Sequence, residues 1–114
     1  RLVRLFTTNS SGADLSGLSY PNYRDYRDRA EALSGLAAYR IVMVNVGASQ
    51  RDTTQAWGLM VTGNYFDVLG VQAARGRTFA PEEDKTPNTH PVIVLSHAYW
   101  TRRFQSDPGI VGRT

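Results

Sequence analysis

The alternation of hydrophobic and polar positions divides the chain into short strand-like and helix-like segments. Residues 1–8 are apolar on both alternating faces, a pattern typical of a strand that is covered on both sides. We therefore predict a first strand there. Residues 9–17 are rich in Ser, Gly and Asp, whose side chains compete with regular backbone pairing, and these residues predict a loop.

The segment that follows has helical periodicity. Ser19 stands at a cap position, and Pro21 falls in the first turn, where its missing N–H costs nothing. We predict a helix from about Tyr20 to Leu33 that ends at Ser34-Gly35. One stripe of this helix is expected to face a sheet. Its residues recur at spacings of three, four and three: Tyr23, Tyr26, Ala30 and Leu33. The opposite face pairs charges at i,i+4 in Arg24 with Asp28, Asp25 with Arg29, and Arg27 with Glu31.

The middle of the chain is the strongest hairpin candidate. Residues 36–46 form a run rich in β-branched and aromatic side chains, which favours a strand over a helix. Residues 47–52 are polar and of hairpin length, and residues 53–62 provide the return strand. In that strand Trp57, Leu59 and Val61 share one face, and Ala56, Gly58 and Met60 share the other.

A short capped helix is predicted directly after the hairpin. The side-chain oxygen of Asn64 can cap it, Asp67 lies near its positive N-terminal end, and Gly70 can take the left-handed conformation that ends it. Residues 71–79 then read as a short extended piece. Pro81 and the three acids after it indicate the first turn of a brief helix with a solvated surface.

The last third combines a polar loop, a strand and a helix. Lys85 to Pro91 is the loop, and residues 91–95 read as a buried strand. Ser96 caps a final helix in which Trp100 and Phe104 lie at i,i+4. A turn follows at residues 107–109, and residues 111–114 resemble the start of a strand. The order β-α-β-β-α-β-β-α-β predicts an α+β fold: a mixed or antiparallel sheet with the hairpin Leu36–Thr62 and three helices packed on it.

Composition narrows the functional classes. The chain has 114 residues, the size of one domain, and it contains no cysteine, which excludes disulfides and thiolate metal sites. Its longest apolar run is far shorter than the ~20 residues of a membrane-spanning helix. It begins with Arg1 and ends abruptly, so we expect a soluble piece of a longer polypeptide.

The basic excess is small. The chain has 13 Lys and Arg residues against 10 Asp and Glu residues, a formal net charge of +3. All but one of the basic residues are arginine, and arginines alternate with acids in residues 24–31 instead of clustering. A solvated surface of mixed charge is the favoured interpretation. A small basic nucleic-acid-binding α+β module is the alternative, motivated by the sequence pI of about 9.6 and the bias toward arginine.

Catalytic and cofactor signatures were sought and not found in the sequence. The only lysine is Lys85, which rules out a phosphate-binding loop ending in Gly-Lys-Ser/Thr, and neither G-x-G-x-x-G nor G-x-S-x-G occurs. His90 and His97 do not have the spacing that brings two imidazoles to one metal. The adjacent acids Glu82 and Glu83 are the only feature of the sequence that supports the hypothesis of a small hydrolase. We expect no catalytic residue, no cofactor and no metal.

Several segments in order resemble one known family, the MacB-like periplasmic core domain of FtsX-like permeases in ABC transport systems. The segments are residues 18–23 (LSYPNY), 61–71 (VTGNYFDVLGV), 76–79 (GRTF), 92–96 (VIVLS) with 100–104 (WTRRF), and 107–112 (DPGIVG), together with the terminal residues 111–114 (VGRT). The resemblance extends over nearly all of residues 1–114 and corresponds to the N-terminal portion of the family domain.

The resemblance implies a non-catalytic domain on the periplasmic side of the bacterial cytoplasmic membrane, within an integral membrane protein. It implies coupling of cytoplasmic ATP hydrolysis to substrate export or to mechanical work in the periplasm. The implied partners are the rest of the permease chain, a second permease protomer, a separate cytoplasmic ATPase subunit and, as a further candidate, a periplasmic adaptor, with no nucleic acid. Family substrates include macrolides, peptides, siderophores and lipoproteins. We expect a surface that contacts other proteins, formed by Asn64, Tyr65, Phe66, Lys85, Asn88 and His90.

Overall fold

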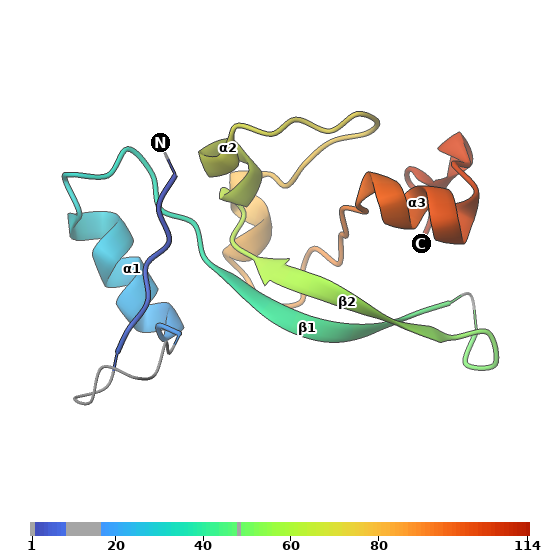
Figure 1. Ribbon diagram of the computed structural model, residues 1–114, viewed down its shortest axis with the longest axis horizontal. Helices are drawn as coiled ribbons and strands as arrows, with labels where there is room; N and C mark the ends of the chain where they lie inside the picture. The colour runs from blue at the N-terminus through green and yellow to red at the C-terminus, as the bar shows by residue number, and fades with distance from the viewer. Residues whose placement is uncertain (1, 9–16, 48) are drawn as a thin grey trace. The chain divides into compact units, whose positions relative to one another are not determined.

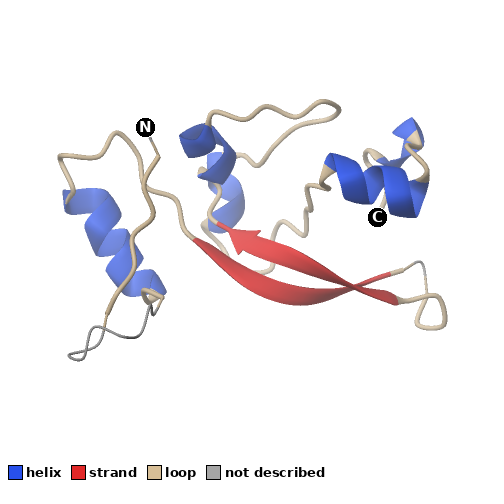
Figure 2. Cartoon of the chain, viewed as in Figure 1, coloured by secondary structure: helices blue, strands red, loops and turns tan. Residues whose placement is uncertain are grey.

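The computed structural model describes residues 2–8, 17–47 and 49–114. In chain order its elements are α1 (Tyr20–Arg29), β1 (Tyr39–Val46), β2 (Thr54–Val61), α2 (Tyr65–Leu69), the 3-10 helix η1 (Pro81–Asp84), α3 (His97–Phe104) and the 3-10 turn η2 (Pro108–Ile110) (Figures 1 and 2). Helices combined with a two-stranded sheet are compatible with the predicted α+β class. The chain forms two compact units, residues 1–60 and residues 61–114, called here the N-terminal and the C-terminal unit.

The N-terminal segment is not the strand that the apolar pattern predicted. Within residues 2–8 only Thr7 makes a strand-type bridge, and the side chains of Leu2 and Val3 are both 62% exposed. The Arg4 guanidinium instead lies over the rings of Phe6 and Tyr39, at 4.7 and 5.5 Å from their centroids. A strand needs a regular ladder of backbone hydrogen bonds, and residues 2–6 and 8 are not assigned to one. The loop predicted at residues 9–17 lies outside the described residues except for Gly17.

Helix α1 begins where the sequence predicted. The Ser19 hydroxyl oxygen accepts a hydrogen bond from the Asn22 N–H at 3.3 Å, and Pro21 lies in the first turn. The predicted stripe is only partly buried: Tyr23 is 4% exposed, whereas Tyr26 is 53% exposed. Tyr23 is the one large hydrophobic residue that is buried in the described part of the chain.

The predicted end of α1 at Leu33 is wrong, because the helix ends at Arg29 and Ala30 leaves the helical conformation. A turn follows, in which the Glu31 N–H bonds to the Arg29 carbonyl. The Tyr23 hydroxyl donates to the Leu36 carbonyl at 3.0 Å. A helix continued to Leu33 would carry Leu36 away from that hydroxyl, so the tertiary hydrogen bond favours the earlier end. Beyond the helix Glu31 is out of register with Arg27, which pairs with Asp28 at 2.8 Å.

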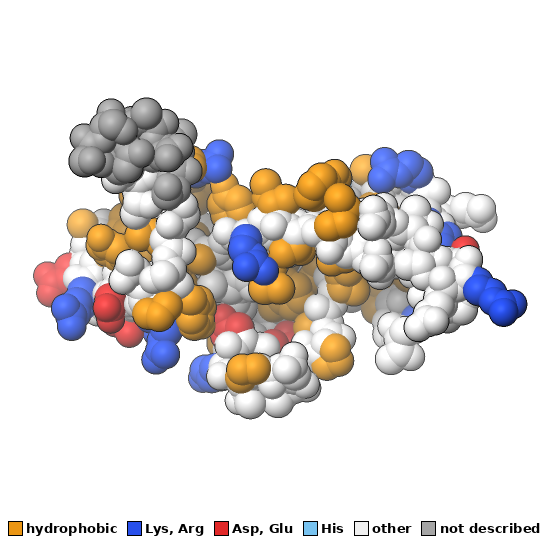
Figure 3. Space-filling view, turned by 90° about the horizontal axis from the view of Figure 1, so that it is seen from below, with side chains coloured by type: hydrophobic (Ala, Val, Ile, Leu, Met, Phe, Trp, Pro, Cys, Tyr) orange, Lys and Arg blue, Asp and Glu red, His pale blue; other side chains and the backbone are white. Residues whose placement is uncertain are grey.

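The hairpin forms as predicted, with β1 and β2 as the two strands of one sheet. Both strands alternate in burial: the even-numbered residues of β1 from Val42 to Val46 are half-buried, and so are Ala56 and Gly58 in β2. A Cβ atom added to Gly58 would lie 3.7 Å from a methyl group of Val42, which places these residues on one face. The opposite face, with Ile41 at 63% and Trp57 at 74% exposure, is open to solvent. Figure 3 shows many exposed hydrophobic side chains on the face that it displays.

The C-terminal unit holds the short helices. Helix α2 ends at Gly70, whose φ of +70° is the predicted left-handed conformation. The predicted side-chain cap is wrong, because Asn64 has φ −89° and ψ 6° and its Oδ1 accepts instead from the Thr62 hydroxyl at 2.8 Å. In α3 the predicted Ser96 cap is confirmed, with its Oγ accepting from the Tyr99 N–H at 3.2 Å.

The other predicted strands do not form. Residues 71–79, 91–95 and 111–114 are irregular or turn, and Ile93 in the segment predicted to be a buried strand is 67% exposed. In the described residues the sheet consists of β1 and β2 alone, so none of these segments is paired with either strand. The ring contacts of α3 also differ from the predicted Trp100–Phe104 pair: Trp100 contacts His97, and Phe104 contacts Tyr99.

Candidate interaction surface

A buried turn at residues 62–64 connects the end of β2 to α2. Thr62 is 6% exposed and Gly63 is also buried. The Gly63 N–H donates to the Asp84 carboxylate at 2.7 Å, across 21 residues of chain. A Cβ atom at position 63 would lie 3.1 Å from the Ala80 carbonyl oxygen and 3.2 Å from Asp84 Cγ. Only glycine therefore fits this contact without a shift of the neighbouring backbone.

A second acid of η1 holds the chain that leads into this helix. The Glu83 carboxylate accepts two hydrogen bonds from the Arg77 guanidinium, at 2.7 and 3.0 Å, and a third from the Ala80 N–H at 2.7 Å. Hydrogen bonds lower the pKa of Glu83 to about 2. The bond from the Arg77 guanidinium has the largest effect, followed by that from the Ala80 N–H. The prediction of a solvated acidic turn is wrong for Glu83, whose side chain is 8% exposed.

Helix α2 supplies the aromatic part of the predicted surface. The ring centroids of Tyr65 and Phe66 lie 5.3 Å apart in an edge-on arrangement, and the Phe66 ring lies 5.7 Å from Phe79. Such contacts contribute beyond simple burial. Asn64, Tyr65 and Phe66 are all half-buried. These three residues therefore pack within the C-terminal unit and also keep part of their surface exposed.

The loop after η1 carries the exposed part of the predicted surface. Lys85, Asn88 and His90 are all exposed. Asn88 has a φ of +59°, a left-handed conformation that asparagine tolerates better than most residues. The hydroxyl oxygen of Thr89 lies 2.8 Å from the carbonyl oxygen of Thr86, to which it donates, and 2.8 Å from His90 Nδ1. The loop thus has internal hydrogen bonds that fix its turn.

The two parts of the predicted surface are joined through η1. Asn64 directly follows Gly63, and Lys85 directly follows Asp84, so the Gly63–Asp84 hydrogen bond brings the two segments together. In Figure 1 η1 lies next to α2 in the same unit. Asn88 and His90 lie further along the loop, whose hydrogen bonds join Thr89 to Thr86 and to His90. Sequence reasoning missed Gly63, Arg77, Glu83 and Asp84 as the residues that hold this arrangement, although the first two lie in segments that resemble the family.

Several arginines are engaged within their own unit. Arg77 pairs with Glu83, Arg75 lies 5.9 Å from the Trp100 ring centroid, and Arg102 lies 5.7 Å from that of Tyr99. These three guanidinium groups each contact a ring or a carboxylate of the C-terminal unit. The nucleic-acid-binding alternative therefore stays a prediction supported by the net charge. Among the described residues, no three His, Asp or Glu side chains are grouped so that they could hold a metal ion.

Comparison with known proteins identifies the family. The family model described as MacB-like periplasmic core domain matches residues 1–114. No curated protein and no solved structure matches the chain. In the described part of the chain no helix is long and apolar enough to cross a membrane. Domains of this family are the periplasmic, generally non-catalytic parts of permeases of the ABC transporter type. On the match over its whole length, the chain belongs to the family of MacB-like periplasmic core domains.

Proposed function

We propose that this chain transmits movement between the membrane part of an ABC permease and proteins in the periplasm. Cytoplasmic ATP hydrolysis, performed by a separate subunit, supplies the energy, and the domain applies it to substrate export or to mechanical work. The family match over residues 1–114 is the observation that carries this proposal. The rest of the permease, a second protomer and a periplasmic adaptor are the partners it requires.

The contacts around η1 support a mechanical role. A domain that transmits displacement has to move as a stiff body, because a joint that yields absorbs the movement. Gly63 and Asp84 link the end of β2 to η1, and Glu83 links η1 to Arg77. These hydrogen bonds involve charged groups, which makes them shorter and stronger than neutral ones. Movement of η1 would therefore be passed to the turn before α2.

The proposed contact surface consists of Asn64, Tyr65, Phe66, Lys85, Asn88 and His90. Its composition supports binding to protein: two aromatic rings that are half exposed, and a polar loop with one cation. Internal packing is the alternative role for Asn64, Tyr65 and Phe66, and the ring contacts between Tyr65, Phe66 and Phe79 also fit it. Cross-linking distinguishes the two.

The coupling part of the proposal is tested in the intact permease with its ATPase subunit. Gly63→Val places a branched side chain against the Ala80 carbonyl and Asp84, while Gly17→Val is the control, because a Cβ at position 17 meets nothing within 4 Å. We expect transport per permease to fall several-fold with Gly63→Val while ATP hydrolysis continues. Asp84→Asn, a milder change, should show the same separation to a smaller extent. Transport that falls only in parallel with permease abundance would contradict coupling through this joint.

The contact surface is tested by placing a photo-reactive amino acid at Lys85 or Asn88 in cells that carry the intact permease. Gln72, which is exposed in the same unit, is the control position. We expect cross-linked protein at Lys85 and Asn88 and little at Gln72. Equal yields at all three positions would argue against a specific surface.

A further inference from the structure

The most exposed large hydrophobic side chain in the described residues is Trp57, at 74% exposure. Trp57 lies on the open face of β2. Met43, which is also at an odd-numbered position and lies on the open face of β1, is 47% exposed. A large aromatic ring left in water is unfavourable by itself, and such residues often mark a binding site. Trp57 has no role in the contacts around η1, so its exposure needs another explanation.

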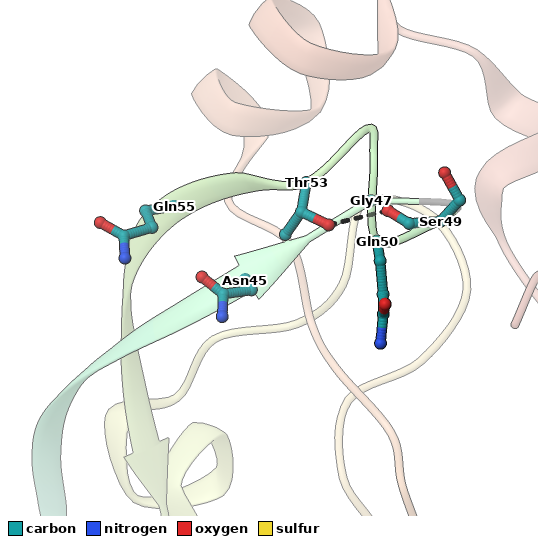
Figure 4. Close-up of a pocket in the computed structure, with 6 residues that line it drawn as sticks. All are labelled: Asn45, Gly47, Ser49, Gln50, Thr53 and Gln55. Atoms are coloured by element: carbon teal, nitrogen blue, oxygen red, sulfur yellow. Dashed lines mark hydrogen bonds between the residues drawn. The ribbon is translucent and has the colours of Figure 1, made fainter.

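A polar hollow of about 740 Å³ lies at the tip of the same hairpin (Figure 4). The hollow is shallow and open to solvent, so a ligand there would be bound on one side only. All the residues that line it are uncharged: Asn45, Gly47, Ser49, Gln50, Thr53 and Gln55. The Thr53 hydroxyl donates to the Ser49 carbonyl at 2.8 Å, which closes the tip and leaves the lone pairs of this hydroxyl as acceptors.

The hollow and Trp57 lie on one face of the sheet. Gln55 and Trp57 are two residues apart in β2, and residues so spaced in a strand point to the same face. The side chains of Asn45 and Gln55 come from the two neighbouring strands and extend toward the same side (Figure 4). The Trp57 side chain therefore lies on the same face of β2 as Gln55, at the next position along that face, within the N-terminal unit.

The chemistry of this site selects a class of ligand. Each amide side chain offers both donors and an acceptor, which suits the hydroxyl groups of a sugar, since these also donate and accept. A charged ligand would find no opposite charge among the lining residues. A flat, exposed indole presents an apolar face on which a ring can stack. We propose that the tip of the β1–β2 hairpin binds a neutral oligosaccharide, with Trp57 as the stacking platform and Asn45 and Gln55 as the hydrogen-bonding groups.

The test uses the whole chain and two sugars of equal length, neutral maltotetraose and anionic tetragalacturonate. The chain has two tryptophans, so a Trp100→Phe background makes Trp57 the only indole reporter. We expect its fluorescence to change on titration with maltotetraose, with a Kd on the order of 1 mM, the weak range suited to an open site with few contacts. Tetragalacturonate should bind at least tenfold more weakly.

Variants separate the site from the rest of the hairpin. These variants are made in the chain that retains Trp100, and maltotetraose binding is measured by NMR. Trp57→Ala and Gln55→Ala should each weaken this binding at least fivefold. Met60→Ala is the control: Met60 is 60% exposed, in the same strand but at an even-numbered position of the other face. The far-ultraviolet circular dichroism of each variant has to match that of the parent. The proposal is overturned if maltotetraose does not bind, if Trp57→Ala binds as the parent does, or if tetraglycine binds in its place, which would assign the site to peptides.

Discussion

The hydrogen bond between the Gly63 N–H and the Asp84 carboxylate is the contact on which the arrangement of the C-terminal unit depends most. It joins residues 21 positions apart at 2.7 Å, and the N–H belongs to a buried glycine. Asp84→Ala removes the acceptor and leaves that N–H without it. An unmade hydrogen bond at a buried group costs more than the mean contribution of a hydrogen bond, because the group has lost its water.

The size of the effect follows from the charge on the acceptor. Hydrogen bonds to charged groups contribute about 1.5–3 kcal/mol. Because Asp84 is exposed to solvent, we expect Asp84→Ala to lower the free energy of unfolding by the lower end of this range, about 1.5 kcal/mol. Asp84→Asn keeps an acceptor oxygen without the charge and should cost about half as much. Glu82→Ala is the matched control, since it removes one acid from the exposed side of the same 3-10 helix and should change the free energy by less than about 0.5 kcal/mol.

Urea unfolding followed by Trp100 fluorescence measures these values for the C-terminal unit. The variants are made in a Trp57→Phe background, which removes the second indole. Because Trp57 is exposed, this replacement should change the stability little. Hydrogen exchange of the Gly63 amide gives an independent reading, because its protection should fall in Asp84→Ala and persist in Glu82→Ala. Equal stability of Asp84→Ala and Glu82→Ala, with Gly63 still protected, would refute the reasoning.

Four further substitutions test other parts of the structure. The pKa of Glu83 is lowered from 4.5 to about 2 on folding, so its carboxylate stabilises the fold above about pH 4.5, and this contribution is lost as the pH falls through 2. Glu83→Gln should flatten that part of the pH dependence of unfolding, and an unaltered profile would refute the Arg77 pairing as its cause. Tyr99→Phe should leave thermal stability unchanged or raise it by up to about 1 kcal/mol, since the buried hydroxyl has no hydrogen-bond partner among the described residues; a clear loss would show that it has one. Gly58→Ala should stabilise the hairpin by about 0.5 kcal/mol, because the new Cβ meets β1 at ordinary contact distance. Gly70→Ala should instead lower the free energy of unfolding by about 1 kcal/mol, because the φ of Gly70 is +70°. The reverse order of stability in urea unfolding would contradict both expectations.

Local signals in the sequence predicted helix caps well, although the predicted end of α1 at Leu33 is wrong. Ser19 and Ser96 cap as expected, and Gly70 takes the left-handed conformation, because these choices depend on a few adjacent residues. Asn64 is the exception. Its side-chain oxygen has a competing donor two residues earlier, the Thr62 hydroxyl, and a cap signal cannot rank two such partners.

Strand predictions were correct only where both partner strands are neighbours in the sequence. The β1–β2 hairpin needs a short polar connection and two β-prone runs, all of which are visible in residues 36–62. Residues 1–8 and 91–95 have the same apolar character, yet pairing depends on an edge elsewhere in the chain, and periodicity does not supply one. The even-numbered side of β1 is half-buried while Ile41 on the other side is 63% exposed, which composition alone could not decide.

The candidate surface shows how a site can depend on residues that look unremarkable in sequence. Thr62-Gly63-Asn64 reads as an ordinary turn, and Glu83 and Asp84 read as acids attracted to a helix N-terminus. Both readings are local, whereas the contact that matters spans 21 residues. A glycine at position 63 is required because the Ala80 carbonyl oxygen and Asp84 approach within 3.2 Å of where a Cβ would lie. If the proposed surface binds a partner, a force on Lys85 reaches Asn64 through this one bond, so the stiffness of the Gly63–Asp84 contact sets how much movement passes between the two segments.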